Sequence, residues 1–197
     1  MPDVKHFEPD QVLAAAELLF WRRGVTATGV QEVLTATGLS RSSLYNAFGG
    51  KDDVYVAALR RYLDQRSRPA FAELAADERG VPAISDFFDR LLAARCSGQF
   101  AGWGCLISNA HLEQPSDQAQ AVLDEHQAAL RNALSAALTA ADDLGQLRPG
   151  LDLGATAEHF ALLAYAVNLR SRAGAPAKTL RSAVDAALHA ISQNPST

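Results

Sequence analysis

Apolar side chains recur every three or four positions through most of this sequence, and glycine and proline residues divide the pattern into segments. Such spacing places apolar residues on one face of an α-helix, where they can pack against other helices. No stretch shows the alternation of apolar and polar residues that marks a half-buried strand. The sequence therefore predicts an all-α fold of about nine helices. They are expected at about residues 9–23, 28–37, 40–48, 51–77, 82–96, 104–113, 115–144, 152–173 and 176–192.

The cysteine count and the apolar runs limit where the chain can work. Two cysteines, Cys96 and Cys105, are too few for a disulfide scaffold. No apolar run approaches the roughly 18 residues that a membrane span requires. The first ten residues, MPDVKHFEPD, contain no apolar core of a signal peptide. We therefore expect a cytoplasmic protein that does not enter a membrane.

One short region is locally positive, although the chain as a whole has a formal net charge of −4. Residues 21–51 contain a single acid, Glu32, and four cations, which are Arg22, Arg23, Arg41 and Lys51. Such a patch on an acidic body suggests a face that meets an anionic partner.

The segment GLSRSSLYNAFGGK, at residues 38–51, follows one short expected helix and contains another. Helices of fewer than about 12–15 residues are marginal on their own, so both must pack against longer neighbours. Three residues including a glycine join them, which is the geometry of a helix-turn-helix. A plain turn between two packed helices is the alternative. The local positive charge and the absence of acids in the segment favour the helix-turn-helix.

Polar residues mark the starts of these two helices. Thr28 and Gln31 match a capping box at the start of the first. Ser40 is suited to cap the second. Within that second helix, Leu44 and Phe48 are expected to face the protein interior.

The second helix of such a motif lies in the major groove and presents its N-terminal residues to the base edges. Arginine can pair with guanine, asparagine with adenine, and serine with several bases. A phenol, an ammonium group or the free N–H groups of a helix N-terminus can hold phosphate oxygens. We expect base contacts from Arg41, Ser42, Ser43 and Asn46, and phosphate contacts from Thr28, Gly29, Tyr45 and Lys51.

Residues 20–59, FWRRGVTATGVQEVLTATGLSRSSLYNAFGGKDDVYVAAL, resemble the DNA-binding domain of the tetracycline-repressor (TetR) family of transcriptional regulators. The resemblance covers about residues 8–60. One departure is that Gly49 and Gly50 precede Lys51, where family members often have a capping residue such as serine. The matching features are Phe20, Gly24, Thr28-x-Val30, Gly38-Leu39-Ser40, Leu44-Tyr45-x-x-Phe48 and Lys51.

The resemblance implies a homodimer of all-α subunits. A helix-turn-helix domain would span residues 1–50, the helix at about 51–77 would connect, and residues 78–197 would bind a ligand and dimerise. The expected function is that of a ligand-responsive homodimeric repressor, which binds a palindromic operator and is released by a small molecule. Double-stranded operator DNA, a second copy of the chain and a small-molecule effector are therefore the expected partners.

A second resemblance concerns Cys105. The segment GWGCLISNAHLE, at residues 102–113, is similar to a Gly-Cys-Leu-x-x-Asn segment of a TetR subgroup, some members of which respond to oxidants or electrophiles through this cysteine. The position of Cys105 at the start of a short helix favours a thiolate. A redox- or electrophile-sensing regulator is therefore one alternative function. The competing interpretation is a small buried residue that suits tight packing.

Aromatic and apolar residues of the C-terminal part, together with a few polar groups, could line a ligand pocket. Each of them could instead be an ordinary core or surface residue, and His159 is expected to be a core histidine with its hydrogen bonds satisfied. The expected pocket residues are Phe87, Phe88, Leu91, Phe100, Trp103, Leu106, Asn109, His111, Phe160, Tyr165 and Asn168.

The last two expected helices carry small and apolar residues, which allow helices to approach closely in a four-helix dimer interface. A core contained within one subunit is the alternative. The expected interface residues are Ala161, Leu162, Tyr165, Leu169, Val184, Ala187, Leu188 and Ile191.

No motif indicates an enzyme. The sequence lacks a glycine-rich phosphate loop after a strand, an HExxH pair, a CxxC pair and a nucleophile elbow. We therefore expect no catalytic residue, no metal site and no cofactor. A helical interaction protein that does not bind DNA is the remaining alternative.

Overall fold

The computed structural model describes residues 8–193, and every helix and turn reported below lies within that range. The all-α prediction is confirmed, with ten α-helices and one π-helical turn in this part of the chain. The elements are α1 (Pro9–Arg23), α2 (Val30–Thr37), α3 (Arg41–Phe48), α4 (Lys51–Tyr62), η1 (Leu63–Ser67), α5 (Arg68–Ala76), α6 (Val81–Cys96), α7 (Leu106–Ala110), α8 (Asp117–Asp143), α9 (Leu153–Arg172) and α10 (Ala177–Ile191).

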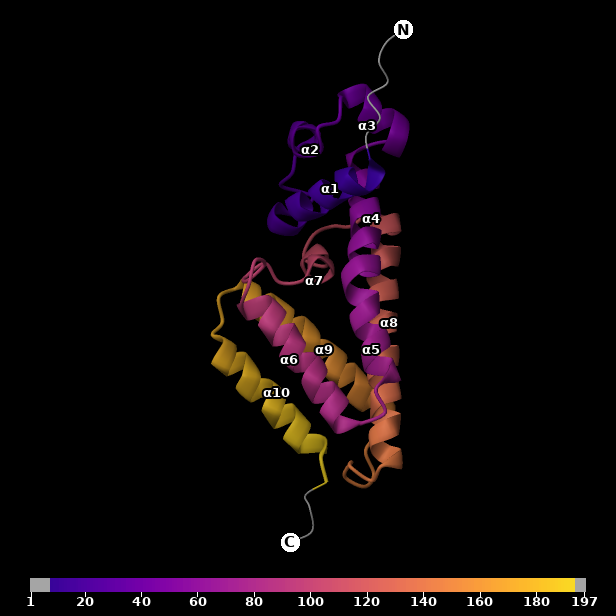
Figure 1. The fold of residues 1–197 in the computed structure, drawn as a ribbon, viewed down its shortest axis with the longest axis vertical. Coiled ribbons are helices and arrows are strands. Elements are labelled where there is room, and N and C mark those ends of the chain that lie inside the picture. The colour runs from indigo at the N-terminus through magenta and orange to yellow at the C-terminus, as the bar shows by residue number, and fades with distance from the viewer. Residues whose placement is uncertain (1–7, 194–197) are drawn as a thin grey trace.

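The helices form a small N-terminal group and a larger C-terminal group (Figure 1). Helices α1, α2 and α3 lie at one end of the molecule, and the run of α4, η1 and α5 extends from them alongside α8. Helices α6, α9 and α10 pack together on the other side of this run. The N-terminal core also takes in α7 and the first turns of α8, so the two groups share buried surface.

Local contacts explain where the two short helices begin. Ser40 caps α3 as predicted, because its hydroxyl oxygen accepts a hydrogen bond from the backbone N–H of Ser43 at 3.0 Å. The capping box predicted for Thr28 and Gln31 is wrong. The N-cap of α2 is Gly29, whose N–H donates to the carboxylate of Glu32 at 2.8 Å.

The helix predicted at 51–77 is a continuous helical run with one wide turn inside it. Pro69 has no backbone N–H, and its ring would clash with the carbonyl four residues earlier. The regular α-helical bonding pattern is therefore interrupted before it, and the N–H of Arg68 bonds to the carbonyl of Leu63, five residues back. This π-helical turn, η1, places Arg66 and Ser67 at the wall of a cavity.

The helix predicted at 104–113 is shorter, because Gly104 cannot start it. Gly104 has a φ angle of +69°. A Cβ atom at this position would lie 2.9 Å from the carbonyl oxygen of Asn168 on α9. Helix α7 therefore begins at Leu106, and α8 begins after Ser116 rather than at Pro115.

Candidate nucleic-acid interface and ligand cavity

Helix α3 lies at the end of the molecule away from α10 (Figure 1), and its exposed face is polar. Leu44 is fully buried and anchors the helix in the N-terminal core. Arg41, Ser42 and Asn46 are exposed, and Tyr45 is 46% exposed. Because Leu44 anchors the helix while these four residues face outward, α3 can meet a partner without losing its own packing. Phe48 is half-buried against the same core.

The serines of this segment interact with one another. The hydroxyl of Ser40 lies 3.0 Å from that of Ser42 and 2.8 Å from that of Ser43. Ser43 is half-buried, whereas Ser42 is exposed. Of the two, Ser42 is therefore the better placed for a base contact.

At the start of α2, the groups of Thr28 and Gly29 that were expected to bind phosphate already have hydrogen-bond partners within the protein. Thr28 is buried, and its hydroxyl donates to the carbonyl of Gly24 at 2.6 Å, so the expected contact from this side chain is corrected. The N–H of Gly29 donates to Glu32, which places a carboxylate where a phosphate was expected. Both residues instead shape the turn between α1 and α2.

Lys51 has a structural role in addition to the expected one. Its ammonium group donates to the carbonyls of Val25 at 3.0 Å and of Thr28 at 3.1 Å, and thereby ties the start of α4 to the turn between α1 and α2. An ammonium group has three donors, so one N–H remains for a phosphate.

The four cations of residues 21–51 do not gather on one face. Arg23 forms an ion pair with Glu32. Arg22 lies over the ring of Trp103, with its guanidinium 5.9 Å from the ring centre. Only Arg41 belongs to α3, so the patch inferred from the sequence is divided in space.

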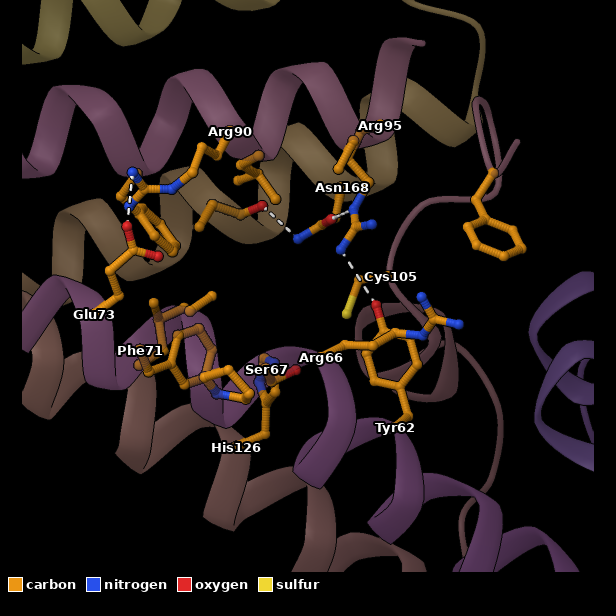
Figure 2. A pocket seen from close by; sticks show the side chains of 18 of the residues that line it. Tyr62, Arg66, Ser67, Phe71, Glu73, Arg90, Arg95, Cys105, His126 and Asn168 are labelled. Carbon is orange, nitrogen blue, oxygen red and sulfur yellow. Dashed lines mark hydrogen bonds and ion pairs between the residues drawn. The ribbon is translucent and has the colours of Figure 1, made fainter. Parts of the chain in front are cut away.

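A cavity of about 580 Å³ lies between the run of α4, η1 and α5 and the pair α6 and α9 (Figure 2). Of the expected pocket residues, Phe87, Leu91, Phe100 and Asn168 line it, and Cys105 lines it as well. The sequence reasoning missed Trp21, Tyr62, Arg66, Phe71, Arg90, Arg95 and His126, which also form its wall.

The other expected pocket residues lie elsewhere. Phe88, Leu106 and Phe160 are fully buried in the two cores. Trp103 packs edge-on against Trp21, with ring centres 5.5 Å apart. Asn109 lines a separate cavity of about 520 Å³ beside the turn that follows α1.

Tyr165 and His111, also expected in the pocket, form a polar chain behind its wall. The Tyr165 hydroxyl lies 3.2 Å from Nε2 of His111 and 3.3 Å from Nδ1 of His126. Burial, followed by the nearby His126, lowers the pKa of His111. His159, expected to be a core histidine, is exposed on α9.

Arg95 crosses the cavity wall and donates hydrogen bonds to an amide and a phenol (Figure 2). Its Nε donates to the side-chain oxygen of Asn168 at 2.5 Å, and one terminal nitrogen donates to the hydroxyl of Tyr62 at 3.2 Å. Burial raises the pKa of Tyr62, so this phenol stays neutral.

Cys105 is 3% exposed and lies beside this arginine (Figure 2). Burial alone raises the pKa of its thiol. The imidazole of His126, the guanidinium of Arg95 and the hydroxyl of Tyr62 together outweigh burial and lower the thiol pKa to about 6. A thiol with this pKa is mostly ionised at neutral pH, and the thiolate is the nucleophilic form.

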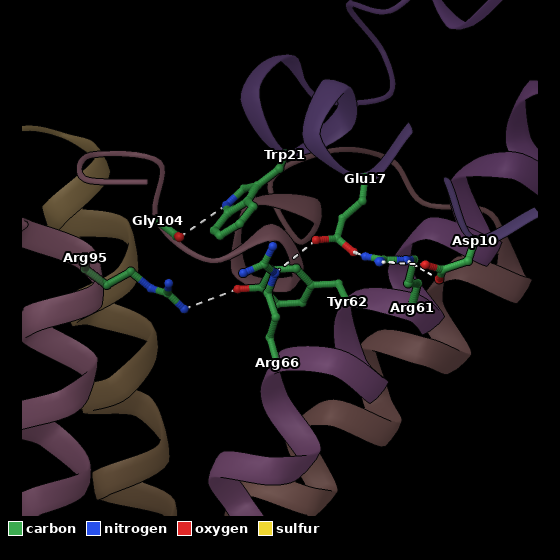
Figure 3. Close-up of polar contacts among 8 residues, drawn as sticks. All are labelled: Asp10, Glu17, Trp21, Arg61, Tyr62, Arg66, Arg95 and Gly104. Carbon is green, nitrogen blue, oxygen red and sulfur yellow. Dashed lines mark hydrogen bonds and ion pairs between the residues drawn. The ribbon is translucent and has the colours of Figure 1, made fainter. Parts of the chain in front are cut away.

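Two side chains of α1, Glu17 and Trp21, form polar contacts with residues around the cavity (Figure 3). Glu17 is 1% exposed and forms ion pairs with Arg61 at 2.7 Å and with Arg66 at 2.9 Å. The indole N–H of Trp21 donates to the carbonyl of Gly104 at 3.2 Å. At the end of α9, Arg172 donates to the carbonyl of Trp21 at 3.2 Å. Helix α1, which packs against α2 and α4 and shares the N-terminal core with α3, is thus bonded directly to the elements around the cavity.

The expected dimer interface is partly overturned. Ala161, Val184, Leu188 and Ile191 are buried within the core of a single subunit, as the alternative interpretation held. Leu169 and Ala187 are half-buried. Leu162, in contrast, is 58% exposed. It lies on an exposed stripe of α9 formed by Ala155, His159, Leu162, Ala166 and Arg170.

One sequence signal could have identified the arginine in the cavity. Phe87, Leu91 and Arg95 are spaced by four residues on one helix, so they share a face. A cation on an otherwise apolar stripe is unusual unless it meets a partner there. No comparable signal exists for Trp21 or His126, which reach the cavity from distant helices.

Neither metal binding nor membrane insertion finds support in the described helices. Across residues 8–193, no group of three or more His, Cys, Asp or Glu side chains is placed to hold a metal ion. In the same range, each helix is too short or too polar to cross a membrane.

Two family descriptions match the sequence. Residues 12–58 match bacterial regulatory proteins of the tetR family, and residues 80–187 match the tetracyclin repressor-like C-terminal domain. The HTH-type transcriptional repressor ComR of Escherichia coli (strain K12) is 28% identical over 180 residues, which cover 89% of this chain and 85% of that protein.

Solved structures share the fold. A cysteine mutant of the TetR family transcriptional regulator CifR, complexed with 26-bp double-strand operator DNA, has a TM-score of 0.81 at 24% identity and covers 94% of this chain and 98% of its own. The reduced form of E. coli NemR has a TM-score of 0.81 at 22% identity and covers 95% and 98%.

Proposed function

The chain belongs to the tetR family of bacterial regulatory proteins and is a DNA-binding transcriptional regulator, and we propose that it is a homodimeric repressor released from a palindromic operator by a small molecule. The main support for this proposal is the geometry of helix α3, which is anchored by the buried Leu44 and presents exposed polar side chains. The similarity to ComR, which is named a repressor, and to CifR bound to operator DNA supports the proposal.

In this proposal, the N-terminal half of α3 enters the major groove. Arg41, Ser42 and Asn46 reach the base edges, and Ser43 contributes less because it is half-buried. The phenol of Tyr45 and the remaining N–H of Lys51 hold phosphate oxygens at the edge of the groove.

Replacing Arg41 or Asn46 with alanine is expected to weaken operator binding by about 1–3 kcal/mol, because each loses a base contact. The free-energy preference for the operator over unrelated duplexes should fall by the same amount. Tyr45→Phe removes a phosphate contact and should weaken all duplexes alike. Fluorescence anisotropy with labelled duplexes at several salt concentrations measures both quantities.

Arg60→Ala is the matched control for these variants. Arg60 is an exposed cation on α4 that faces Glu125 on α8 at 3.8 Å, away from α3. Its loss should leave affinity and operator preference unchanged. If the α3 variants also bind normally, α3 is not the helix that reads the operator. If the original protein binds no duplex, a helical interaction protein without DNA binding becomes the better account.

Two recognition helices must lie about 34 Å apart to read successive major grooves, which requires two subunits. The exposed stripe of α9 and the small exposed residues of α10, such as Ala183, Ala186 and Ala190, support a four-helix interface. Close approach of these helices would cover Leu162.

The substitution Leu162→Glu is expected to shift the dimer towards monomer by at least about tenfold in dissociation constant, because it places charge in an apolar contact. Sedimentation velocity over a range of protein concentrations measures the shift. Leu144→Glu is the control, since Leu144 is 56% exposed at the end of α8 and outside this stripe. Equal behaviour of the two variants would remove α9 from the interface.

Entry of a ligand would affect DNA binding because α1 forms part of the cavity wall. Trp21 belongs to α1, which packs against α2 and shares the N-terminal core with α3, and it also lines the cavity. A molecule that displaces this side chain would move α1 relative to α9, and both recognition helices would move with it.

A second candidate function is electrophile sensing through Cys105, favoured by the thiol pKa of about 6 and by the position of the thiol on the cavity wall. A small electrophile that enters the cavity would meet a thiolate. The covalent adduct would then occupy the space beside Arg95.

The alkylation rate of Cys105 by iodoacetamide is expected to rise with pH and to reach half its maximum near pH 6, because only the thiolate reacts. An ordinary thiol reaches that point at about pH 8.5. Mass spectrometry of quenched samples separates Cys105 from Cys96. In the Cys105→Ser variant, electrophiles should no longer release DNA. Release that persists in this variant, or a midpoint above about pH 8, would exclude this function.

A further inference from the structure

The cavity contains one cation without a carboxylate partner. Three arginines line it. Arg66 forms an ion pair with Glu17, and Arg90 forms one with Glu73 at 3.2 Å. Within residues 8–193, no carboxylate lies within ion-pair distance of Arg95. Its side chain donates to the amide of Asn168 and the phenol of Tyr62, and the thiol of Cys105 lies beside it.

A half-buried guanidinium without a carboxylate partner is costly, because hydrogen bonds to an amide and a phenol and a nearby thiol compensate its lost hydration only in part. Arginine also has five N–H donors in a planar fork. Asn168 and Tyr62 engage one donor each, so part of the fork remains for a ligand. A carboxylate is the group that fits such a fork best, because it accepts two parallel hydrogen bonds.

The rest of the wall is suited to an apolar body. Aromatic rings from four helices and from the loop after α6 surround the cavity: Trp21, Tyr62, Phe71, Phe87 and Phe100. Leu91 and Leu130 complete the apolar surface. A pocket that combines apolar walls with one polar anchor binds a molecule built in the same way.

We propose that the effector of this cavity is an apolar or aromatic monocarboxylate, whose carboxylate binds Arg95 between Asn168 and Tyr62 and whose body lies among the aromatic rings. The inference deepens the proposed function and rests on it. It identifies the chemical class of the ligand and the side chain that selects it.

Cys105 supplies an internal competitor for the same cation. Its thiolate would provide Arg95 with a negative charge when the cavity is empty. A bound carboxylate therefore takes over a role that the thiolate holds in the free protein. Removal of the thiol should leave Arg95 at least as ready to bind a carboxylate.

The position of Arg66 indicates how such a ligand would act on α1. Its guanidinium lies 5.0 Å from the ring centre of Trp21 and 4.9 Å from that of Phe100, and it also holds Glu17. A ligand with a negative charge would draw Arg66 towards the cavity and weaken its hold on Glu17. The ion pair between Arg66 and Glu17, which joins η1 to α1, would therefore weaken.

Isothermal titration calorimetry with three acids tests the inference: benzoate, 2-naphthoate and decanoate, each compared with its own primary amide. The amide has nearly the same shape without the charge. At least one acid should bind at least about tenfold more tightly than its amide, a difference of about 1.4 kcal/mol. Equal binding of acid and amide, or no binding of any acid, would overturn the proposal.

Variants assign the preference to one side chain. Arg95→Met should abolish the preference for the acid, and Arg95→Lys should retain part of it, because an ammonium keeps the charge without the fork. Arg131→Met, an exposed arginine of α8 outside the cavity, is the control for the loss of a positive charge. Cys105→Ser should bind the acid at least as tightly as the original protein does. Circular dichroism confirms that each variant is folded.

The outcomes separate this inference from the proposed function. If Arg90→Met abolishes the preference for acid over amide and Arg95→Met does not, the carboxylate binds at Arg90, and the inference is overturned. Operator binding is measured on the same samples without ligand. If operator binding is present and the acid preference is absent, the inference fails alone. If operator binding is itself absent, the proposed function fails.

Discussion

Replacing Trp21 with alanine is expected to lower the free energy of unfolding by about 3–5 kcal/mol, the cost of removing a large buried ring. Trp21 is 1% exposed and contacts the rings of Tyr62 at 5.0 Å and Phe100 at 4.9 Å. The substitution would leave a cavity between α1 and η1, and it would also remove the hydrogen bond to Gly104. Urea unfolding followed by circular dichroism, at one fixed protein concentration, measures the loss.

Trp103→Ala is the matched control for this prediction. Trp103 is half-buried and packs edge-on against the same ring, but its hydrogen bonds are made by its backbone, which the substitution retains. Its loss should therefore cost less than that of Trp21. Similar losses for the two variants would contradict the view that the deeper burial of Trp21 and its side-chain hydrogen bond make it the more important of the two rings.

The substitution Glu17→Ala is expected to lower the free energy of unfolding by about 3 kcal/mol. It leaves Arg61 and Arg66 without their buried partner, and removing one member of a buried ion pair costs far more than losing a surface pair. We expect the lower end of the usual range, because Arg61 keeps Asp10 and the Arg66 side chain is 36% exposed. The same urea unfolding experiment measures this loss.

Glu125→Ala provides the comparison. Glu125 also joins two arginines, Arg60 and Arg68, but its side chain is 41% exposed. Water screens such pairs, so the substitution should change the free energy of unfolding by at most about 1 kcal/mol. If Glu125→Ala costs as much as Glu17→Ala, burial does not explain the strength of the Glu17 contacts.

The sequence predicted the fold and α3 because local signals determine both. The apolar spacing gave helices close to the observed bounds, and Ser40 caps α3 as expected. The starts of α2 and α7 were predicted wrongly, because each depends on a contact that the apolar spacing does not show. At α2, Glu32 bonds back to Gly29, and at α7 the φ angle of Gly104 is set by its close approach to α9.

The cavity was less predictable, because its wall comes from residues far apart in the chain. Trp21, Arg66 and His126 meet there only after α1, η1 and α8 have packed. The predicted charge patch failed for a related reason. Arg22 and Arg41 are close in sequence, but Arg22 lies over Trp103 and Arg41 lies on α3.

The dimer residues show the limit of periodicity as a guide. Val184, Leu188 and Ile191 form an apolar stripe that would suit either a core or an interface, and packing against α6 and α9 uses it for the core. The exposed stripe of α9 contains fewer large apolar residues and gives a weaker signal.

Selection of duplexes from a random pool tests the central claim most directly, that two α3 helices of a dimer read DNA. The account predicts enrichment of an inverted repeat whose half-sites are about one helical turn, 34 Å, or a multiple of it apart. It also predicts two subunits per half-site pair and loss of enrichment with Arg41→Ala. A pool that shows no enrichment, or an enriched sequence without two-fold symmetry that Arg41→Ala binds equally well, would contradict the account.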